Sequence, residues 1–346
     1  MNAATPVPTG FDEIRRIVAG WPDADEAARA AAIERDRQLT KPAGSLGRLE
    51  TMVQWLASWQ AKCPPTIERP RVAVFAGSHG VAARGVSAYP PDVTAQMVRN
   101  FIAGGAAINQ ICRIADAELR VYEMAVERPV GDFTAGPAMD EETCARAMAY
   151  GMMAVEPGID LICLGEMGIG NTTAGAALAA ALFGGDGAQW VGPGTGVEGA
   201  ALAHKIAVVD QGLARHRAAG SKPDPLSMLA AFGGQEMAAI AGAVIAARMA
   251  RVPVLLDGFV STVSAAVLHA MQPGALDHCR VGHLSTEPGH RRLVDAMEKR
   301  PLLDVDLRLG EASGAALAIP LLRASVACHT GMATFAEAGV SKRRPT

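Results

Sequence analysis

The chain has 346 residues, of which 50% are hydrophobic, 4% are aromatic and 19% are charged, and its formal net charge is −3. This length fits one large domain or two unequal domains with a substantial core. Few aromatic side chains and a nearly balanced charge exclude a nucleic-acid platform built on base stacking or bulk positive charge. No apolar run reaches the roughly 18 residues of a membrane span, so a membrane partner is excluded as well.

The cysteines and the N-terminus indicate the compartment. Six cysteines lie singly at positions 63, 112, 144, 163, 279 and 328, without a CxxC pair. This pattern predicts buried free thiols in a reducing cytoplasm. The first residues, MNAATPVPTGFDEIRR, lack the basic start and apolar stretch of a secretion signal, which agrees with a cytoplasmic location.

The N-terminal 65 residues have a helical pattern. An alanine- and charge-rich segment predicts a helix over 23–38, and an apolar stripe predicts another over 45–60. Ser45 is expected to cap the second helix, and Pro64 and Pro65 are expected to end it.

From residue 71 onward, short β-branched runs alternate with long alanine-rich stretches. The expected strands are 72–76, 119–126, 160–164, 253–256 and 279–284. The expected helices are 93–115, 141–155, 172–182, 197–217, 236–250, 261–271 and 288–299. Strands that are hydrophobic throughout are covered on both faces, so this order predicts an α/β fold with a doubly wound, mostly parallel sheet.

A last apolar helix is expected over 313–328, before a basic tail. We expect this helix to pack with the N-terminal helices as a small helical domain made of residues 1–65 and 305–346. Residues 66–304 then form the large α/β domain.

The loop after the third expected strand carries the strongest signal. Ligands bind doubly wound sheets outside the carboxyl ends of the strands. This loop reads GEMGIGNT over 165–172, a phosphate-loop spacing between a strand and a helix. Asn171 stands where a nucleoside-triphosphate loop carries lysine, which favours a cradle for one terminal phosphate. The alternative is a tight strand-to-helix turn that simply needs glycine.

Three charged residues near the loops suggest chemistry, and each has a simpler interpretation. Glu166, inside the phosphate loop, either meets a positive or proton-bearing partner or forms a cap or salt bridge. Lys205 follows the glycine cluster GPGTG at 192–196 and either reaches the same phosphate or faces solvent. Glu311, in a glycine-flanked loop, is either a base with a raised pKa or a first-turn carboxylate.

The histidines give weaker signals. His278, His283 and His290, with Cys279 and Glu287, have metal-ligand chemistry but match no structural-zinc spacing. We therefore expect them to line a cleft and to hold no metal. His79, in the loop after the first strand, is either functional or a buried, hydrogen-bonded side chain.

Seven segments match a known family in the same order along the chain. They are LTKPAGSLGRLE (39–50), FAGSHGVAARGVSAYPPDVTAQMVRNFIAGGAAIN (75–109), GEMGIGNTTAGAAL (165–178), GPGTG (192–196), PVLLDGF (253–259), GHLSTEPGH (282–290) and RLGEASGAALAIP (308–320). Together they span nearly the whole chain and resemble the nicotinate-nucleotide:dimethylbenzimidazole phosphoribosyltransferase family. The resemblance implies a Rossmann-like large domain, a small domain of terminal helices, and a homodimer without metal or organic cofactor.

The resemblance also implies the reaction. Ribose 5-phosphate would move from nicotinate mononucleotide to 5,6-dimethylbenzimidazole, giving α-ribazole 5′-phosphate and nicotinate for the lower ligand of cobalamin. Glu311 would be the general base that removes the benzimidazole proton, and Glu166 would assist it. Attack opposite the departing nicotinate would invert the configuration at C1′.

By the same resemblance, two groups of residues would bind the substrates. The flat base would contact Tyr89, Gln96, Met97, Met167 and Leu309. The nucleotide and its phosphate would contact Gly168, Gly170, Asn171, Thr172, Thr173, Gly194, Lys205, Asp257 and Ser285. Because aromatic residues are scarce, we expect methionine and leucine to hold the base, with Tyr89 as the one nearby ring.

Two positions depart from the family pattern. Ser78 stands where the family usually has an aspartate before its histidine, so a carboxylate that would orient His79 is missing from the loop. Ala312 stands where glycine is usual and adds a methyl group beside Glu311.

Three other functions fit less well. A triphosphate hydrolase or phosphotransferase lacks its lysine at Asn171 and an evident acidic magnesium motif. A diphosphate-dependent phosphoribosyltransferase lacks its paired-acid loop. A non-catalytic nucleotide-sensing module would keep the phosphate loop but would have no need of Glu311.

Overall fold

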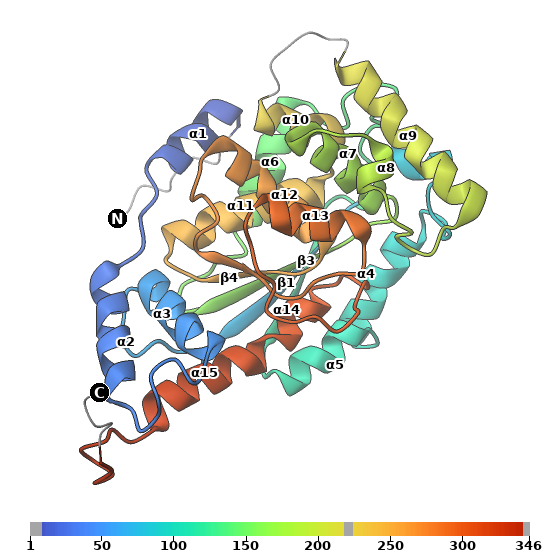
Figure 1. The fold of residues 1–346 in the computed structure, drawn as a ribbon. Helices are drawn as coiled ribbons and strands as arrows, with labels where there is room; N and C mark the ends of the chain where they lie inside the picture. Colours follow the sequence, from blue (N-terminus) through green and yellow to red (C-terminus); the bar gives the residue numbers. More distant parts are fainter. Residues whose placement is uncertain (1–8, 218–223, 342–346) are drawn as a thin grey trace.

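Five parallel strands form the centre of the computed structural model, which describes residues 9–217 and 224–341. The strands are β1 (Pro70–Ala76), β2 (Glu118–Glu123), β3 (Leu161–Met167), β4 (Val254–Leu256) and β5 (Cys279–Val281). Their order across the sheet is β2-β1-β3-β4-β5, and every pair is parallel. Figure 1 labels the three central strands, β1, β3 and β4. The predicted doubly wound sheet is confirmed, and the chain reverses its direction of winding between β1 and β3.

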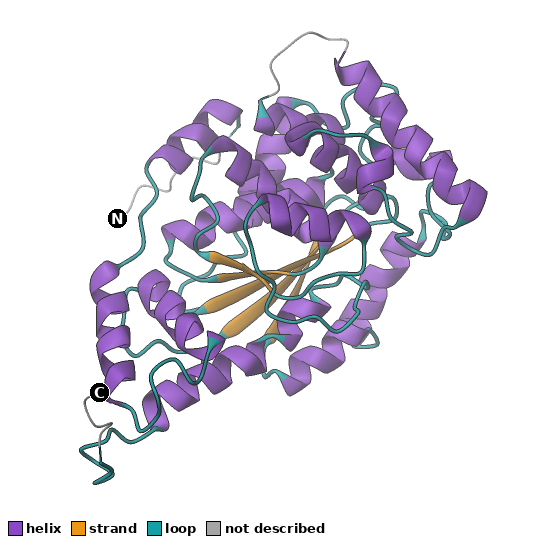
Figure 2. Ribbon diagram, viewed as in Figure 1, coloured by secondary structure: helices purple, strands orange, loops and turns teal. Residues whose placement is uncertain are grey.

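Helices cover both faces of the sheet (Figure 2). One face packs against α6 (Glu141–Met152), α7 (Asn171–Phe183), α11 (Gln235–Met249) and α12 (Phe259–Met271). The other packs against α3 (Arg48–Gln60), α5 (Ala107–Ile114), α14 (Ser313–Leu317) and α15 (Ile319–Gly331). Because successive side chains of a strand point to opposite faces, Phe75 joins the first core while Val74 joins the second.

The small residues of the chain let these helices approach closely. On α6, a Cβ added to Gly151 would collide with the backbone of Ala239 on α11. A Cβ on Gly242 of α11 would likewise collide with the backbone of Met148 on α6. The glycine and alanine content therefore sets the distance between these two helices.

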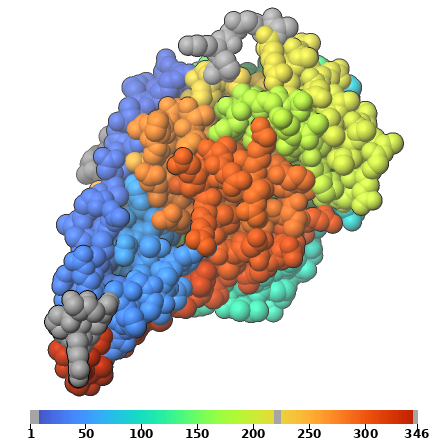
Figure 3. All heavy atoms as spheres, in the orientation of Figure 1, coloured from blue at the N-terminus to red at the C-terminus, as the bar shows by residue number. Residues whose placement is uncertain are grey.

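The remaining helices surround this centre. They are α1 (Phe11–Ala19), α2 (Glu26–Gln38), η1 (Gly80–Arg84), α4 (Val93–Ala103), α8 (Gly187–Trp190), α9 (Gly199–Arg217), α10 (Pro225–Phe232) and α13 (Pro288–Ala296). In the space-filling view, orange residues, including those of α13, cover the front between the blue N-terminal helices and the yellow α9 (Figure 3). Among the described residues, no helix combines the length and apolarity needed to cross a membrane.

All five expected strands are present, but several helix predictions were wrong. The helix expected over 93–115 is two helices, because Gly104 adopts a φ of +80° that ends α4. The helix expected over 313–328 is also divided, into α14 and α15. Ser45 does not cap α3, whose N-cap is Gly47. The helices α1, α8 and α10 were not predicted, since they are short or lack a clear apolar stripe in the sequence.

The cysteine prediction is partly wrong, because all six thiols are free but only four are buried, whereas Cys63 and Cys328 are half-buried. The division into a small domain (1–65 and 305–346) and a large domain (66–304) stays a prediction. The terminal helices α3, α14 and α15 share one hydrophobic cluster with the strands, so they form part of the main core.

Candidate active site

The carboxyl ends of β3, β4 and β5 border a cavity of about 520 Å³. Its wall consists of Tyr89, Glu166, Met167, Gly168, Ile169, Asn171, Thr172, Gly194, Thr195, Gly258, Phe259, Val260, His283, Ser285, Glu287, Asp306, Leu307, Arg308, Leu309 and Gly310. Nine predicted site residues belong to this wall. Seven do not: Gln96, Met97, Gly170, Thr173, Lys205, Asp257 and Glu311.

Glu166 is one of three carboxylates in the cavity wall, with Glu287 and Asp306. It lies near the end of β3, and the side-chain amide of Asn171 donates a hydrogen bond to its Oε2. Burial, followed by the charges of Asp257 and Glu236, raises the pKa of Glu166 to about 8. Such a pKa favours the protonated form of Glu166 at neutral pH, and among the described residues its side-chain partner is the Asn171 amide.

Glu311 lies on a strained turn that touches Glu166. Its backbone N–H donates to the carbonyl of Glu166 at 3.2 Å. Gly310, Glu311 and Ala312 have φ values of +85°, +63° and +64°, so three consecutive residues are left-handed. The Glu311 side chain is 5% exposed and its Oε2 has no hydrogen-bond partner within the described chain. Burial raises the pKa of this carboxyl group, while the facing Ile108 backbone opposes the rise.

Replacing Gly310 by alanine should damage this turn. A Cβ at Gly310 would lie 2.8 Å from Glu166 Oε1, and the φ of +85° is unfavourable for alanine. We expect a stability loss of about 1–2 kcal/mol and at least a tenfold lower turnover. Gly44→Ala is the matched control, because Gly44 has a φ of +76° with open space around it. Similar turnover in the two variants would contradict a role for the Gly310 contact.

Lys205 forms the cationic part of the site. It is almost completely buried on α9, and its Nζ donates to Thr172 Oγ1 and to the Gly192 carbonyl, both at 2.9 Å. Gly194 lies directly against this pair, since an added Cβ would be 2.7 Å from Thr172 Oγ1 and 2.8 Å from Lys205 Nζ. Burial lowers the pKa of Lys205 to about 8, and the nearby Glu287 opposes this shift. The solvent-facing alternative for Lys205 is therefore wrong.

The backbone of the phosphate loop is only partly free to bind an anion. The N–H of Ile169 donates to Thr94 Oγ1 at 3.0 Å, and those of Asn171 and Thr173 donate to loop carbonyls. Thr173 is fully buried, and Gly170, with a φ of +95°, begins α7. The loop therefore offers fewer N–H donors than its glycine spacing suggested, and Thr172 with Lys205 become the main candidates for phosphate binding.

The histidines lie in three different surroundings. His290 accepts from the Ser285 backbone N–H at 2.9 Å and contacts Thr262 Oγ1 at 3.1 Å, so it supports Ser285 from behind the cavity. Burial lowers the pKa of His290 and of His278 to about 3, which keeps both neutral. Only His283 of the three borders the cavity. Across residues 9–217 and 224–341, no three His, Cys, Asp or Glu side chains are grouped to hold a metal ion.

The base-binding residues are brought together in part. Tyr89, Met167 and Leu309 share the cavity wall. On α4, Gln96 is exposed and Met97 packs on the second core, so neither borders the cavity. Phe259 contributes another ring to the wall, which corrects the expectation that Tyr89 is the one aromatic side chain nearby.

The loop with Ser78 keeps a carboxylate partner for its histidine. His79 is buried, and its Nε2 lies 2.6 Å from Oε1 of Glu236, which comes from the first turn of α11. Gly77 and Gly234 are both close to the Glu236 carboxylate, where a Cβ would collide with it. Glu236 therefore orients His79. In the family pattern an aspartate at the position of Ser78 would have this function. Motif spacing contained no signal for this pairing, because the two residues are 157 positions apart.

Glu166 should make stability depend on pH. Its pKa is raised from 4.5 to about 8, so the stabilisation is complete below pH 4.5 and is lost as the pH rises through 8. We expect the free energy of unfolding of Glu166→Gln to fall less between pH 5 and 8 than that of the natural chain, by on the order of 1 kcal/mol. Urea unfolding at both pH values measures this difference, with Glu198→Gln at an exposed position as the control. An unchanged pH dependence in Glu166→Gln would refute the raised pKa.

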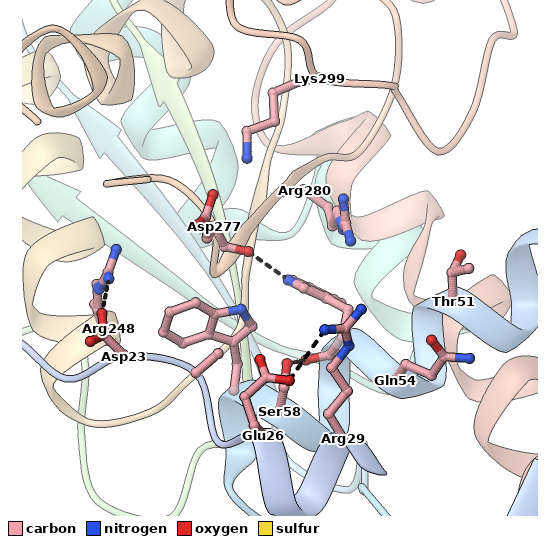
Figure 4. Close-up of a pocket in the computed structure, with 13 residues that line it drawn as sticks. Asp23, Glu26, Arg29, Thr51, Gln54, Ser58, Arg248, Asp277, Arg280 and Lys299 are labelled. Atoms are coloured by element: carbon pink, nitrogen blue, oxygen red, sulfur yellow. Dashed lines mark hydrogen bonds and ion pairs between the residues drawn. The ribbon is translucent and has the colours of Figure 1, made fainter. Parts of the chain in front are cut away.

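A second cleft, of about 610 Å³, lies at the opposite edge of the sheet, between α2, α3 and the start of β5 (Figure 4). Two ion pairs lie in it: Arg29 lies 3.2 Å from Glu26, and Arg248 lies 3.4 Å from Asp23. No predicted site residue borders this cleft. We therefore place the candidate active site at the carboxyl ends of the strands, where doubly wound sheets bind ligands.

Several wall residues were missed from the sequence. The residues concerned are Ile169, Thr195, Gly258, Phe259, Val260, Asp306, Leu307, Arg308 and Gly310. His283 and Glu287 also belong to the wall, as expected of residues that line a cleft. Arg308 donates to the Gly194 carbonyl at 3.0 Å, and the Gly194 N–H donates to Glu287 Oε1 at 2.8 Å. All of them lie in or beside the motif segments, so adjacency to those motifs was the available signal.

A doubly wound parallel sheet with a buried lysine beside a phosphate loop, and with Glu166 in the wall of the same cavity, defines an enzyme that acts on a phosphorylated small molecule. A family model described as Phosphoribosyltransferase matches residues 21–340. The chain belongs to the family of the nicotinate-nucleotide–dimethylbenzimidazole phosphoribosyltransferases, as the following relatives show.

The relatives match over almost their full length. A protein from Brucella anthropi named nicotinate-nucleotide–dimethylbenzimidazole phosphoribosyltransferase is 56% identical over 331 residues, which cover 96% of this chain and 97% of that protein. A protein of the same name from Brucella melitensis biotype 2 is 55% identical with the same coverage. The solved structure of the Thermus thermophilus phosphoribosyltransferase of this name is 43% identical, with a TM-score of 0.84 over 92% of this chain and 100% of that one.

Proposed function

We propose that this chain transfers ribose 5-phosphate from nicotinate mononucleotide to 5,6-dimethylbenzimidazole. The products are α-ribazole 5′-phosphate and nicotinate, and the reaction serves assembly of the lower ligand of cobalamin. The names of the relatives support this assignment. The observation that carries it is a single cavity whose wall includes Thr172, which Lys205 contacts, together with Glu166 and the apolar side chains of Met167 and Leu309. The turn that carries Glu311 is hydrogen-bonded to Glu166.

The residues suggest the following roles. Lys205, Thr172, Gly194 and Ser285 bind the nucleotide, with the phosphate at the Lys205–Thr172 pair. Met167 and Leu309 flank the two glutamates and hold the flat base, with Tyr89 and Phe259 nearby. This arrangement places the base next to the turn that carries Glu311.

The chemistry requires removal of one proton. Glu311 takes the N–H proton of the benzimidazole, and the opposite ring nitrogen forms a bond to C1′. The bond from C1′ to the nicotinate nitrogen breaks, and its electron pair neutralises the pyridinium nitrogen. Because the attack comes from the face opposite the leaving group, the β linkage becomes α. The Glu311 carboxylate must turn from Ile108 toward the cavity to reach the base.

A coupled assay tests the transfer. The purified chain is mixed with nicotinate mononucleotide and dimethylbenzimidazole in EDTA, because we propose that neither a metal nor an organic cofactor takes part. We expect nicotinate release that depends on the base. Release without any base would indicate a hydrolase that cleaves the N-glycosidic bond with water, and no release with any benzimidazole, imidazole or purine base would refute the transferase assignment.

The resemblance also implies a homodimer in the cytoplasm, and this stays a proposal. Light scattering coupled to size exclusion measures the mass directly, and twice the chain mass of 35.8 kDa is the expected value.

A further inference from the structure

Asp257 and His283 form a buried pair at the candidate active site, where His283 borders the cavity and Asp257 does not. Asp257 follows β4 and His283 follows β5, so adjacent strands bring them together at the same edge of the sheet. His283 Nε2 lies 3.5 Å from Asp257 Oδ1, and each side chain is 1% exposed. Two groups that can both carry charge are therefore held together in the interior.

Asp257 anchors the turn that carries Glu311. Its Oδ1 accepts hydrogen bonds from the backbone N–H groups of Gly314 at 2.8 Å and Ala315 at 2.9 Å, at the start of α14. The left-handed residues Glu311 and Ala312 immediately precede these donors. A left-handed conformation costs roughly 1–2 kcal/mol for a residue other than glycine, so the turn needs an external restraint.

His283 packs against the same helix. A Cβ at Gly314 would collide with the His283 ring, and a Cβ at Gly282 would lie 2.6 Å from the Cα of Ala315. The ring nitrogens of His283 and Oδ2 of Asp257 have no hydrogen-bond partner within the described residues. The pair is thus enclosed between the sheet and α14.

Asp257 is not placed to contact a nucleotide. It is fully buried and does not belong to the cavity wall, although the sequence suggested a contact on the nucleotide side. The Asp257 charge nevertheless acts on the site. Burial is the largest cause of the raised pKa of Glu166 and of Glu311, and the Asp257 charge raises both further. Burial lowers the pKa of His283, but the nearby Asp257 carboxylate outweighs this effect and raises the pKa overall.

We propose that Asp257 and His283 are positioning residues, which hold the strained turn that carries Glu311 and set the charge beneath it. The proposal rests on the proposed function, in which Glu311 removes the proton. The titratable groups that face the pair from the surrounding elements are Cys163, Glu166, His290, Asp304 and Glu311.

Two charge-changing variants test the proposal through the pH profile of kcat. Asp257→Asn keeps an oxygen for both N–H donors but removes the charge, so the acid-side midpoint should move down by about half a pH unit or more. His283→Gln leaves the Asp257 charge unbalanced, so the midpoint should move up. Asp257→Ala removes the anchor and should lower kcat at least tenfold. Asp304→Asn, at an exposed carboxylate close to His283, is the control and should leave the midpoint in place.

The outcomes separate the inference from the proposed function. If the natural chain gives no ribazole product, the proposed function fails. If the natural chain is active but Asp257→Asn raises KM for nicotinate mononucleotide more than tenfold with an unmoved midpoint, Asp257 is a nucleotide ligand and the inference is overturned. A purely structural pair would not shift the two midpoints in opposite directions. The inference is therefore also overturned if soluble, folded Asp257→Asn and His283→Gln do not show opposite shifts.

Discussion

Glu311→Gln should lower kcat by about 10²- to 10⁴-fold, the usual contribution of a general base. The amide keeps the shape of the side chain but cannot take the benzimidazole proton. Because Glu311 is not in the nucleotide-binding part of the cavity, the dissociation constant for nicotinate mononucleotide should stay within about threefold. Steady-state turnover and calorimetric binding measure the two effects separately.

Glu166→Gln is the matched comparison for this prediction. Glu166 lies in the cavity wall and already holds a proton at neutral pH, so an amide there resembles the natural state. We expect a much smaller loss of turnover than in Glu311→Gln. If Glu166→Gln is the more damaging change, the proton acceptor is Glu166 and the roles of the two glutamates are reversed.

Lys205→Gln should raise KM for nicotinate mononucleotide by about 10- to 100-fold and change kcat less. Hydrogen bonds to charged groups contribute about 1.5–3 kcal/mol, and the Lys205 ammonium is the buried cation beside Thr172. Since its pKa is about 8, the natural chain should also bind the nucleotide more weakly above pH 8, and the variant should not show that change.

Lys299→Gln provides the control, because Lys299 borders the second cleft, where its Nζ donates to the Leu276 carbonyl at 2.7 Å. It should leave KM for the nucleotide unaltered. Normal nucleotide affinity in Lys205→Gln would show that the phosphate does not bind at the Lys205–Thr172 pair.

The sequence predicted the sheet well because its strands are continuous apolar runs between helices. It placed all five strands, although β3 continues to Met167 and so includes Glu166, which was expected in the loop after the strand. Helix ends were less predictable, since the break between α4 and α5 depends on the backbone conformation at Gly104. A Gly-Gly pair within an apolar pattern is compatible with one continuous helix and with two separate helices.

The arrangement of the site was only partly predictable, because pairs distant in sequence determine it. His79 with Glu236 and Asp257 with the start of α14 are contacts between different strand-to-helix connections. Motif spacing identifies the loops but does not say which side chains face the cavity. Asp257 and Lys205 illustrate this difference. Both were predicted to bind the nucleotide, but only Lys205 contacts the phosphate loop, whereas Asp257 is fully buried.

The configuration of the product is the most direct test of direct displacement at C1′ with a glutamate base. The natural chain is incubated with nicotinate mononucleotide and dimethylbenzimidazole, and the purified ribazole phosphate is examined by proton NMR for the orientation of the bond at C1′. We predict a single product with the α configuration. A β product, a mixture of the two, or the absence of a ribazole product would contradict this account.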